Sequence, residues 1–157
     1  MTVLAACAAA AGAQAATITR AIVLDRSIAG VALGETRSSI ELRTGPGSLV
    51  SARTDSSGHV ERIAYDAAGL YVTYVSAGTL ATRPAGRAVV LETTWTSFRT
   101  QQGVHVGSTL AAVRAIHGVR CYGTVCQHGY MAHGAGTSFL VDPVRRRVVR
   151  IVVSAGR

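Results

Sequence analysis

The chain has 157 residues, of which 48% are hydrophobic and 15% are charged, a composition that supports a folded core and excludes a disordered tail. Its formal net charge is +8, and all 16 of its basic residues other than His are Arg. A basic surface of this kind favours acidic partners, either a protein or an anionic cell-wall polymer. The sequence contains no run of five or more basic residues, so it does not favour nucleic acid as the partner.

Residues 1–16 form an apolar, Ala-rich run without any acidic residue. The run ends in the letters AQA at residues 13–15, an A-x-A pattern typical of signal-peptide cleavage, and it is too short for a transmembrane helix. We therefore expect a secreted protein whose mature chain begins near Ala16 or Thr17. Because a signal peptide has a basic start that this run lacks, we also expect the natural N-terminus to lie further upstream.

Two other interpretations of this N-terminal run stay open. The letters LAAC at residues 4–7 resemble a lipobox, in which case the protein is a lipoprotein anchored through Cys7. The run is also compatible with an Ala-rich helix at the start of a cytosolic protein.

The pattern G-V-x-[L/V]-G-x-T occurs twice, as GVALGET at residues 30–36 and as GVHVGST at residues 103–109. Glycines before a helical run are also typical of phosphate-binding loops, but neither copy has the Gly-Lys-[Ser/Thr] ending that such a loop needs. In the first copy, Glu35 occupies the place that a phosphate would take. We therefore predict that both stretches are structural turns whose alternating apolar residues lie under a sheet.

Each turn is predicted to lead into a short helix of about nine residues. Thr36 and Thr109 stand where a side-chain oxygen can accept a hydrogen bond from a free N–H at a helix N-terminus. Gly45 and Gly118 stand where a left-handed residue ends a helix. The match between the two copies continues without a gap to these glycines, which indicates an internal repeat.

Strands are predicted after each helix, from apolar and β-branched runs separated by Gly, Pro and Asp turns. They lie at residues 60–65, 70–75, 87–95, 119–128, 137–141 and 148–153. We therefore expect an α+β fold of two tandem helix-plus-β-meander repeats, with both helices packed on one antiparallel sheet. After the leader, residues 17–99 form the first unit with an N-terminal extension, and residues 100–157 form the second.

This order of elements resembles the tandem-repeat fold of the β-lactamase inhibitory protein family and the related small lipoproteins of the bacterial outer-membrane assembly machinery. The resemblance covers about residues 27–157 and rests on the G-[hydrophobic]-x-x-G-x-[S/T] lead into a short helix, often closed by Gly-Pro. Gly45-Pro46 keeps that ending and Gly118-Val119 departs from it. The resemblance implies a protein inhibitor that binds its enzyme on a concave sheet face.

Cys121 and Cys126 flank a short segment with a turn-forming Gly, which suits a hairpin-like disulfide in an exported protein. The alternative is a zinc site formed by these two cysteines with His128 and His133. The single residue between the Cys pair and the His pair is shorter than zinc folds usually have, so the disulfide is favoured and both His are expected in a loop.

The sequence contains neither a G-x-S-x-G elbow nor an H-E-x-x-H motif, so we expect a non-enzymatic binding protein without cofactor or metal. A small extracellular hydrolase with a scattered Ser/His site is the alternative. For binding, we predict a contact surface around Tyr71, Tyr74, Arg87 and Trp95, because large aromatics beside Arg are typical of interfaces. The competing interpretation places Trp95 in the core.

Overall fold

The computed structural model describes residues 19–55, 58–77, 86–129 and 134–156. Twelve strands and two α-helices lie in these residues. The strands are β1 (Ala21–Val23), β2 (Ser27–Ile28), β3 (Val31–Ala32), β4 (Ser48–Asp55), β5 (Gly58–Tyr65), β6 (Leu70–Ser76), β7 (Arg87–Thr93), β8 (Arg99–Thr100), β9 (Arg120–Tyr122), β10 (Val125–Gly129), β11 (Gly136–Val141) and β12 (Val148–Ser154). The helices are α1 (Arg37–Thr44) and α2 (Leu110–Arg114), and a 3-10 helix, η1 (Asp66–Ala68), joins β5 to β6.

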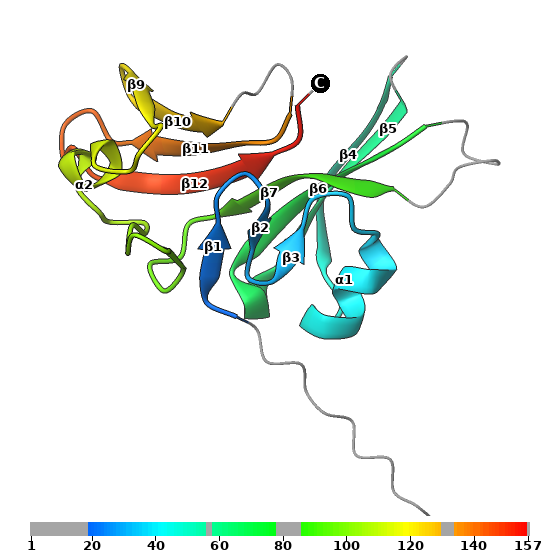
Figure 1. The fold of residues 1–157 in the computed structure, drawn as a ribbon. Helices are drawn as coiled ribbons and strands as arrows, with labels where there is room; N and C mark the ends of the chain where they lie inside the picture. Colours follow the sequence, from blue (N-terminus) through cyan, green and yellow to red (C-terminus); the bar gives the residue numbers. More distant parts are fainter. Residues whose placement is uncertain (1–18, 56–57, 78–85, 130–133, 157) are drawn as a thin grey trace, which may run out of the picture.

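Eight of the strands form one antiparallel sheet in the order β4-β5-β6-β7-β12-β11-β10-β9. Two four-stranded meanders thus meet at their last strands, β7 and β12 (Figure 1). A smaller sheet in the order β3-β2-β1-β8 lies against one face of the large sheet, which we call the inner face. Figure 1 shows α1 beside β4–β6 and α2 at the other end, near the β11–β12 hairpin.

A single hydrophobic core lies between the inner face and the elements that cover it. The large sheet contributes alternate residues of its strands, because successive side chains of a strand point to opposite faces. The fully buried side chains from the large sheet include Ile63, Val72, Leu91, Phe139 and Ile151. The covering side chains include Ile22, Ile28, Val31, Ile40, Phe98, Val104, Leu110 and Val113.

The predicted α+β fold, with two helices packed on one antiparallel sheet, is wrong. The described chain is mostly β with two sheets, and its helices have eight and five residues. A helix this short presents few side chains to a core; α1 buries only Ile40. The small sheet supplies the missing cover through Ile22, Ile28 and Val31, from strands too short to show periodicity in the sequence.

The structure confirms strands at five of the predicted places, namely in β5, β6, β7, β11 and β12, although β7 ends at Thr93. The segment 119–128, predicted as one irregular strand, instead forms β9 and most of β10, joined at Gly123. The prediction missed β4 entirely. The leader, Cys7, the expected mature start and His133 lie outside the described residues.

The first turn, residues 30–36, is attached to the beginning of β7. Gly34 donates its N–H to the Ala88 carbonyl at 2.8 Å, and Ala88 donates to the Glu35 carbonyl at 2.9 Å. The Arg87 guanidinium donates to the Gly34 carbonyl at 3.1 Å. Thr36 caps α1 by accepting from the Ser39 N–H at 3.3 Å, as predicted, and α1 ends at Gly45 with a φ of 80°.

The second turn, residues 103–109, makes the corresponding contacts with β12. Gly107 donates to the Val148 carbonyl at 2.7 Å, and Val148 donates to the Ser108 carbonyl at 2.9 Å. The Arg147 guanidinium donates to the Gly107 carbonyl at 2.8 Å. Thr109 caps α2 by accepting a hydrogen bond from the Ala112 N–H at 3.2 Å. Because both turns direct N–H groups at strand carbonyls, they act as structural turns rather than phosphate loops.

Candidate functional site

The face of the large sheet opposite the core has no second layer among the described elements, and we call it the open face. Residues paired directly across antiparallel strands point to the same side of a sheet. A row of such pairs crosses all eight strands on this face. From β4 to β9 it consists of Ser48, Ala64, Tyr71, Glu92, Val152, Ser138, Gln127 and Arg120.

The middle of the open face holds a network of two arginines, a tyrosine and a carboxylate. The Arg62 guanidinium lies 4.7 Å from the centre of the Tyr71 ring, and its Nη2 donates to Glu92 Oε1 at 2.8 Å. Nε of Arg150 lies 3.3 Å from the same carboxylate oxygen. One carboxylate thus faces two guanidinium groups, so the network keeps a positive charge. Its contacts also restrain side chains that would otherwise lose rotamer freedom when a partner binds.

Trp95 lies just beyond β7 and is 45% exposed, so it does not fill the core. Its ring covers Gly69, where an added Cβ would lie 2.1 Å from a ring carbon. It also stacks on Phe98, with ring centroids 6.3 Å apart. Thr93 donates its hydroxyl to the Gly69 carbonyl at 2.7 Å, which fixes the end of β7 beside the start of β6. Trp95 and Tyr71 therefore lie at the same end of these two strands.

The other two predicted binding residues lie elsewhere. Tyr74 is buried on the inner face, where its hydroxyl hydrogen-bonds the Tyr65 hydroxyl at 2.8 Å. Burial, and next the hydrogen bond with Tyr65, raise the pKa of Tyr74, so this phenol is neutral and structural. Arg87 stands at the opposite end of β7 from Trp95 and is attached to the first turn. Tyr71 and Trp95 lie at the same end of β6 and β7, whereas Tyr74 is buried on the inner face and Arg87 lies at the opposite end of β7.

Three open-face residues were missed by the sequence analysis, namely Arg62, Glu92 and Arg150. A signal for them exists, because each charged residue alternates with buried apolar neighbours such as Ile63, Leu91 and Ile151. That alternation predicts the open face but not the network, since the three residues come from three separate strands.

The predicted disulfide is present, with Cys121 and Cys126 directly paired across β9 and β10. Within the described ranges, no group of three or more His, Cys, Asp or Glu side chains is arranged to hold a metal ion. His128 does not lie in a loop as predicted. It lies in β10, where it pairs with Thr137 of β11. Its Nδ1 lies 2.6 Å from the carboxylate of Asp25, a residue 103 positions earlier in the chain.

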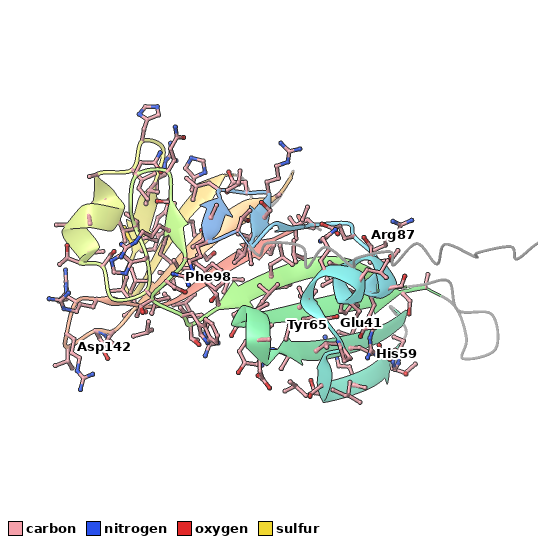
Figure 2. The ribbon with its side chains drawn as sticks, turned by 90° about the horizontal axis from the view of Figure 1, so that it is seen from below. Glu41, His59, Tyr65, Arg87, Phe98 and Asp142 are labelled. Atoms are coloured by element: carbon pink, nitrogen blue, oxygen red, sulfur yellow. A yellow bond between two sulfur atoms is a disulfide. The ribbon has the colours of Figure 1, made fainter. Side chains whose placement is uncertain are left out.

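A hydroxyl also meets an imidazole at the end of the β4–β5 hairpin where β4 connects to β5. Oγ1 of Thr54 lies 2.7 Å from Nδ1 of His59, and Nε2 of His59 lies 2.9 Å from Oε1 of Glu61. Figure 2 shows His59 on the same side of the sheet as Glu41 of α1. The order hydroxyl–imidazole–carboxylate is that of a hydrolase triad, although a Thr stands in place of Ser.

No helix in the described part of the chain is long and apolar enough to cross a membrane.

Comparison with known proteins gives fold likenesses only. No protein-family model and no curated protein matches the chain. A crystal structure of an extracellular protein containing a SCP domain from Bacillus anthracis is similar with a TM-score of 0.49 and 11% identity; the match covers 78% of this chain and 43% of that protein. The uncharacterised protein YfeY from Escherichia coli is similar with a TM-score of 0.44 and 7% identity, covering 84% of this chain and 95% of that one. Neither likeness carries a functional argument.

Proposed function

We propose that this chain is a secreted, non-enzymatic binding protein that docks on an acidic protein through its open face. The observation that supports the proposal best is the Arg62–Tyr71 stack on the open face, with exposed Trp95 at the same end of β6 and β7. Trp, Tyr and Arg are the residues that most often dominate the binding energy of protein interfaces. A surface that already restrains them in the free protein lowers the entropy cost of binding.

The charge of the open face favours an acidic partner. Arg62, Arg150 and Arg120 lie on it, and Glu92 is an acid already shared by two of these arginines. The chain as a whole carries a net charge of +8, which would steer an acidic protein towards it during encounter. A flexible anionic polymer would contact mainly the arginines, whereas a folded acidic protein could also pack on the Tyr71 ring. A folded acidic protein therefore fits this face better.

The proposal also includes secretion of the chain and the kind of partner that the family resemblance implies. The Ala-rich leader and the disulfide both suit an exported protein, and a lipid anchor at Cys7 is the alternative. The resemblance to the β-lactamase inhibitory protein family adds that the partner is a secreted hydrolase bound on a sheet face.

The test is biolayer interferometry against purified acidic secreted hydrolases, a β-lactamase among them, with basic proteins of similar size as the reference set. We expect binding by an acidic protein that Trp95→Ala weakens at least about 30-fold, the effect of a hot-spot residue worth about 2 kcal/mol. Arg62→Gln should weaken it too and reduce its salt dependence. Leu42→Ala, which removes an exposed apolar side chain on α1, is the matched control and should leave binding unchanged.

Two results would count against this function. One is binding that survives both Trp95→Ala and Arg62→Gln; the other is equal binding of acidic and basic proteins. Thermal unfolding of Trp95→Ala is measured in parallel. Because its side chain is 45% exposed, we expect a modest loss of stability, and a loss of several kcal/mol would instead assign Trp95 a core role.

A small hydrolase is the second candidate, and the Thr54–His59–Glu61 chain of hydrogen bonds favours it. In that case His59 would accept the Thr54 proton while Glu61 orients the imidazole. The test is hydrolysis of p-nitrophenyl acetate by the wild-type protein, Thr54→Ala and His59→Gln. Turnover that both substitutions abolish would support the hydrolase; equal background rates in all three proteins would reject it.

A further inference from the structure

An open hollow of about 610 Å³ lies between α2 and the turn that joins β11 to β12, at the opposite end of the molecule from α1 (Figure 1). Four of its lining side chains are arginines and none is acidic. The lining residues are Thr109, Leu110, Ala111, Arg114, Ala115, Arg145, Arg146 and Arg147. The hollow therefore gathers a quarter of the 16 arginines around one space.

The guanidinium groups at this hollow form no ion pair with the acids of the described part of the protein. Arg114, Arg145 and Arg146 are exposed and form no ion pair with a described acid. Arg147 donates to a backbone carbonyl, which fixes its direction but leaves its charge unopposed. Asp142, in the same turn, accepts the N–H groups of Val144 and Arg145 at 2.9 and 2.7 Å, and its charge also interacts with that of Arg145.

The first turn provides an internal reference for this arrangement. Around α1, Arg37 is 2.7 Å from Glu41 and 3.7 Å from Glu61, and Arg43 pairs with Glu35. In the ungapped match between the two turns, Ser108 stands at the position of Glu35 and Arg114 at that of Glu41. The same local fold thus exists in a charge-balanced form at α1, which shows that unbalanced arginines are not required by the turn.

We infer that the hollow between α2 and the β11–β12 turn, which we call the arginine hollow, binds a linear chain of phosphoryl groups. Guanidinium forks match phosphate oxygens bidentately. Four such cations around one space need several negative charges, which a single carboxylate or phosphate does not supply. The backbone N–H groups of Gly107, Ser108 and Leu110 take no part, because they already donate within the protein.

The lining of the hollow also discriminates among polyanions. No aromatic side chain lines it, so the bases of a single-stranded nucleic acid would find no stacking platform there. A phosphate chain without bases can instead contact several of the lining arginines through its phosphoryl oxygens. This site is separate from the open face, so its failure and the failure of the proposed docking function are distinguishable.

The test is isothermal titration calorimetry of the whole chain with sodium tripolyphosphate and with orthophosphate at equal ionic strength. We expect tripolyphosphate to bind at least about tenfold more tightly, because it engages several guanidinium groups at once. The double variant Arg114→Gln/Arg145→Gln should weaken tripolyphosphate binding by about tenfold or more. The control double variant Arg20→Gln/Arg26→Gln makes the same change in net charge at exposed positions that do not line the hollow and should leave binding within about twofold.

Further arms separate the sources of negative charge. Polyglutamate and oligothymidylate of matched charge should bind more weakly than tripolyphosphate, and vesicles containing phosphatidylglycerol should not compete with it. Stronger binding of any of these three, equal effects of the two double variants, or equal affinity for orthophosphate would overturn the inference. Should the double variant not fold, Arg145→Gln alone, in the exposed turn, serves as the second variant. Trp95→Ala should leave tripolyphosphate binding unchanged.

Discussion

At residues 30–36 and at residues 103–109 the chain makes the same turn, the same strand contacts and the same Thr cap, yet the two places carry different surfaces. Around α1 the arginines are paired with Glu35, Glu41 and Glu61. Around α2 the acids are absent from the lining of the hollow, where four arginines gather. Figure 2 places Glu41 and His59 at one end of the molecule and Asp142 at the other.

This difference shows which features of the turn are structural and which are free to vary. Each turn keeps the glycine that reaches a strand carbonyl, with a φ of 84° at Gly34 and 98° at Gly107, because a left-handed residue is needed there. Each also keeps the Thr cap and the Arg that donates to the glycine carbonyl. Apart from the buried Ile40, Leu110 and Val113, the helix positions are at least partly exposed, so their charges are not fixed by packing in the core.

The largest expected effect concerns the core beneath each helix. Ile40 and Val113 occupy matching positions and are both fully buried. Ile40→Ala should lower the free energy of unfolding by about 3 kcal/mol, and Val113→Ala by about 2, because the smaller side chain leaves a smaller cavity. Urea denaturation measures both. A much larger loss for Val113→Ala would show that the α2 end, despite its shorter helix, carries more of the stability.

Much of the secondary structure could be predicted from the sequence because it depends on local signals. The Thr caps, a glycine with positive φ at Gly45 and five strands follow from side-chain oxygens, glycine and alternating apolar residues. β4 was missed because its sequence, SLVSARTD, lacks regular alternation. The small sheet was missed because two- and three-residue strands carry no period.

The candidate sites were predictable only in part, since they depend on pairings between distant residues. Trp95 packs on Gly69 and stays 45% exposed, a placement that no local pattern predicts. Parity along β6 puts Tyr71 and Tyr74 on opposite faces, so one surface does not contain both of these predicted binding residues. The arginine hollow joins α2 to a turn about thirty residues later, which only the register of β12 with the second turn brings together.

The disulfide is the next largest expected effect and acts only at the α2 end. Cys121→Ser/Cys126→Ser should lower the free energy of unfolding by about 2 kcal/mol, the chain-entropy value for so small a loop. The change is measured by thermal unfolding with and without reductant. The wild-type protein in reductant should match the double variant. Identical melting of oxidised and reduced protein would show that the bond does not stabilise this end.

Removal of the helix caps compares the two turns directly. Thr36→Ala and Thr109→Ala should each cost about 1 kcal/mol, because an N–H at the helix start loses its acceptor. α2 has only five residues, so we expect hydrogen exchange to rise throughout α2 in Thr109→Ala but only in the first turn of α1 in Thr36→Ala. The Ser variants keep the hydroxyl and should restore protection; failure to do so would assign the effect to the lost methyl group.

The smallest expected effect is a difference in acid stability between the two turns. Burial raises the pKa of Glu35, but the hydrogen bond from the Ala32 N–H and the pairing with Arg43 outweigh it, and the pKa lies below its ordinary value of 4.5. A lowered carboxyl pKa stabilises the fold above the unfolded-state value, and this contribution is lost as the pH falls from about 4.5 through the folded-state value. Ser108, at the matching position, does not titrate in this range.

The measurement is urea denaturation of the wild-type protein and Glu35→Gln between pH 7 and pH 3. We expect the variant to be less stable by under about 1 kcal/mol at pH 7, where the ion pair is partly exposed, and the two proteins to converge as the pH falls through the folded-state pKa of Glu35. Asp142→Asn is the control, because hydrogen bonds from the N–H groups of Arg145 and Val144 lower the pKa of that carboxyl as well, at the other end of the molecule. If the two ends are independent, the effects of Glu35→Gln and Asp142→Asn should add at every pH. A gap between wild type and Glu35→Gln that persists unchanged to pH 3 would show that the Glu35 carboxylate contributes through packing rather than through its charge.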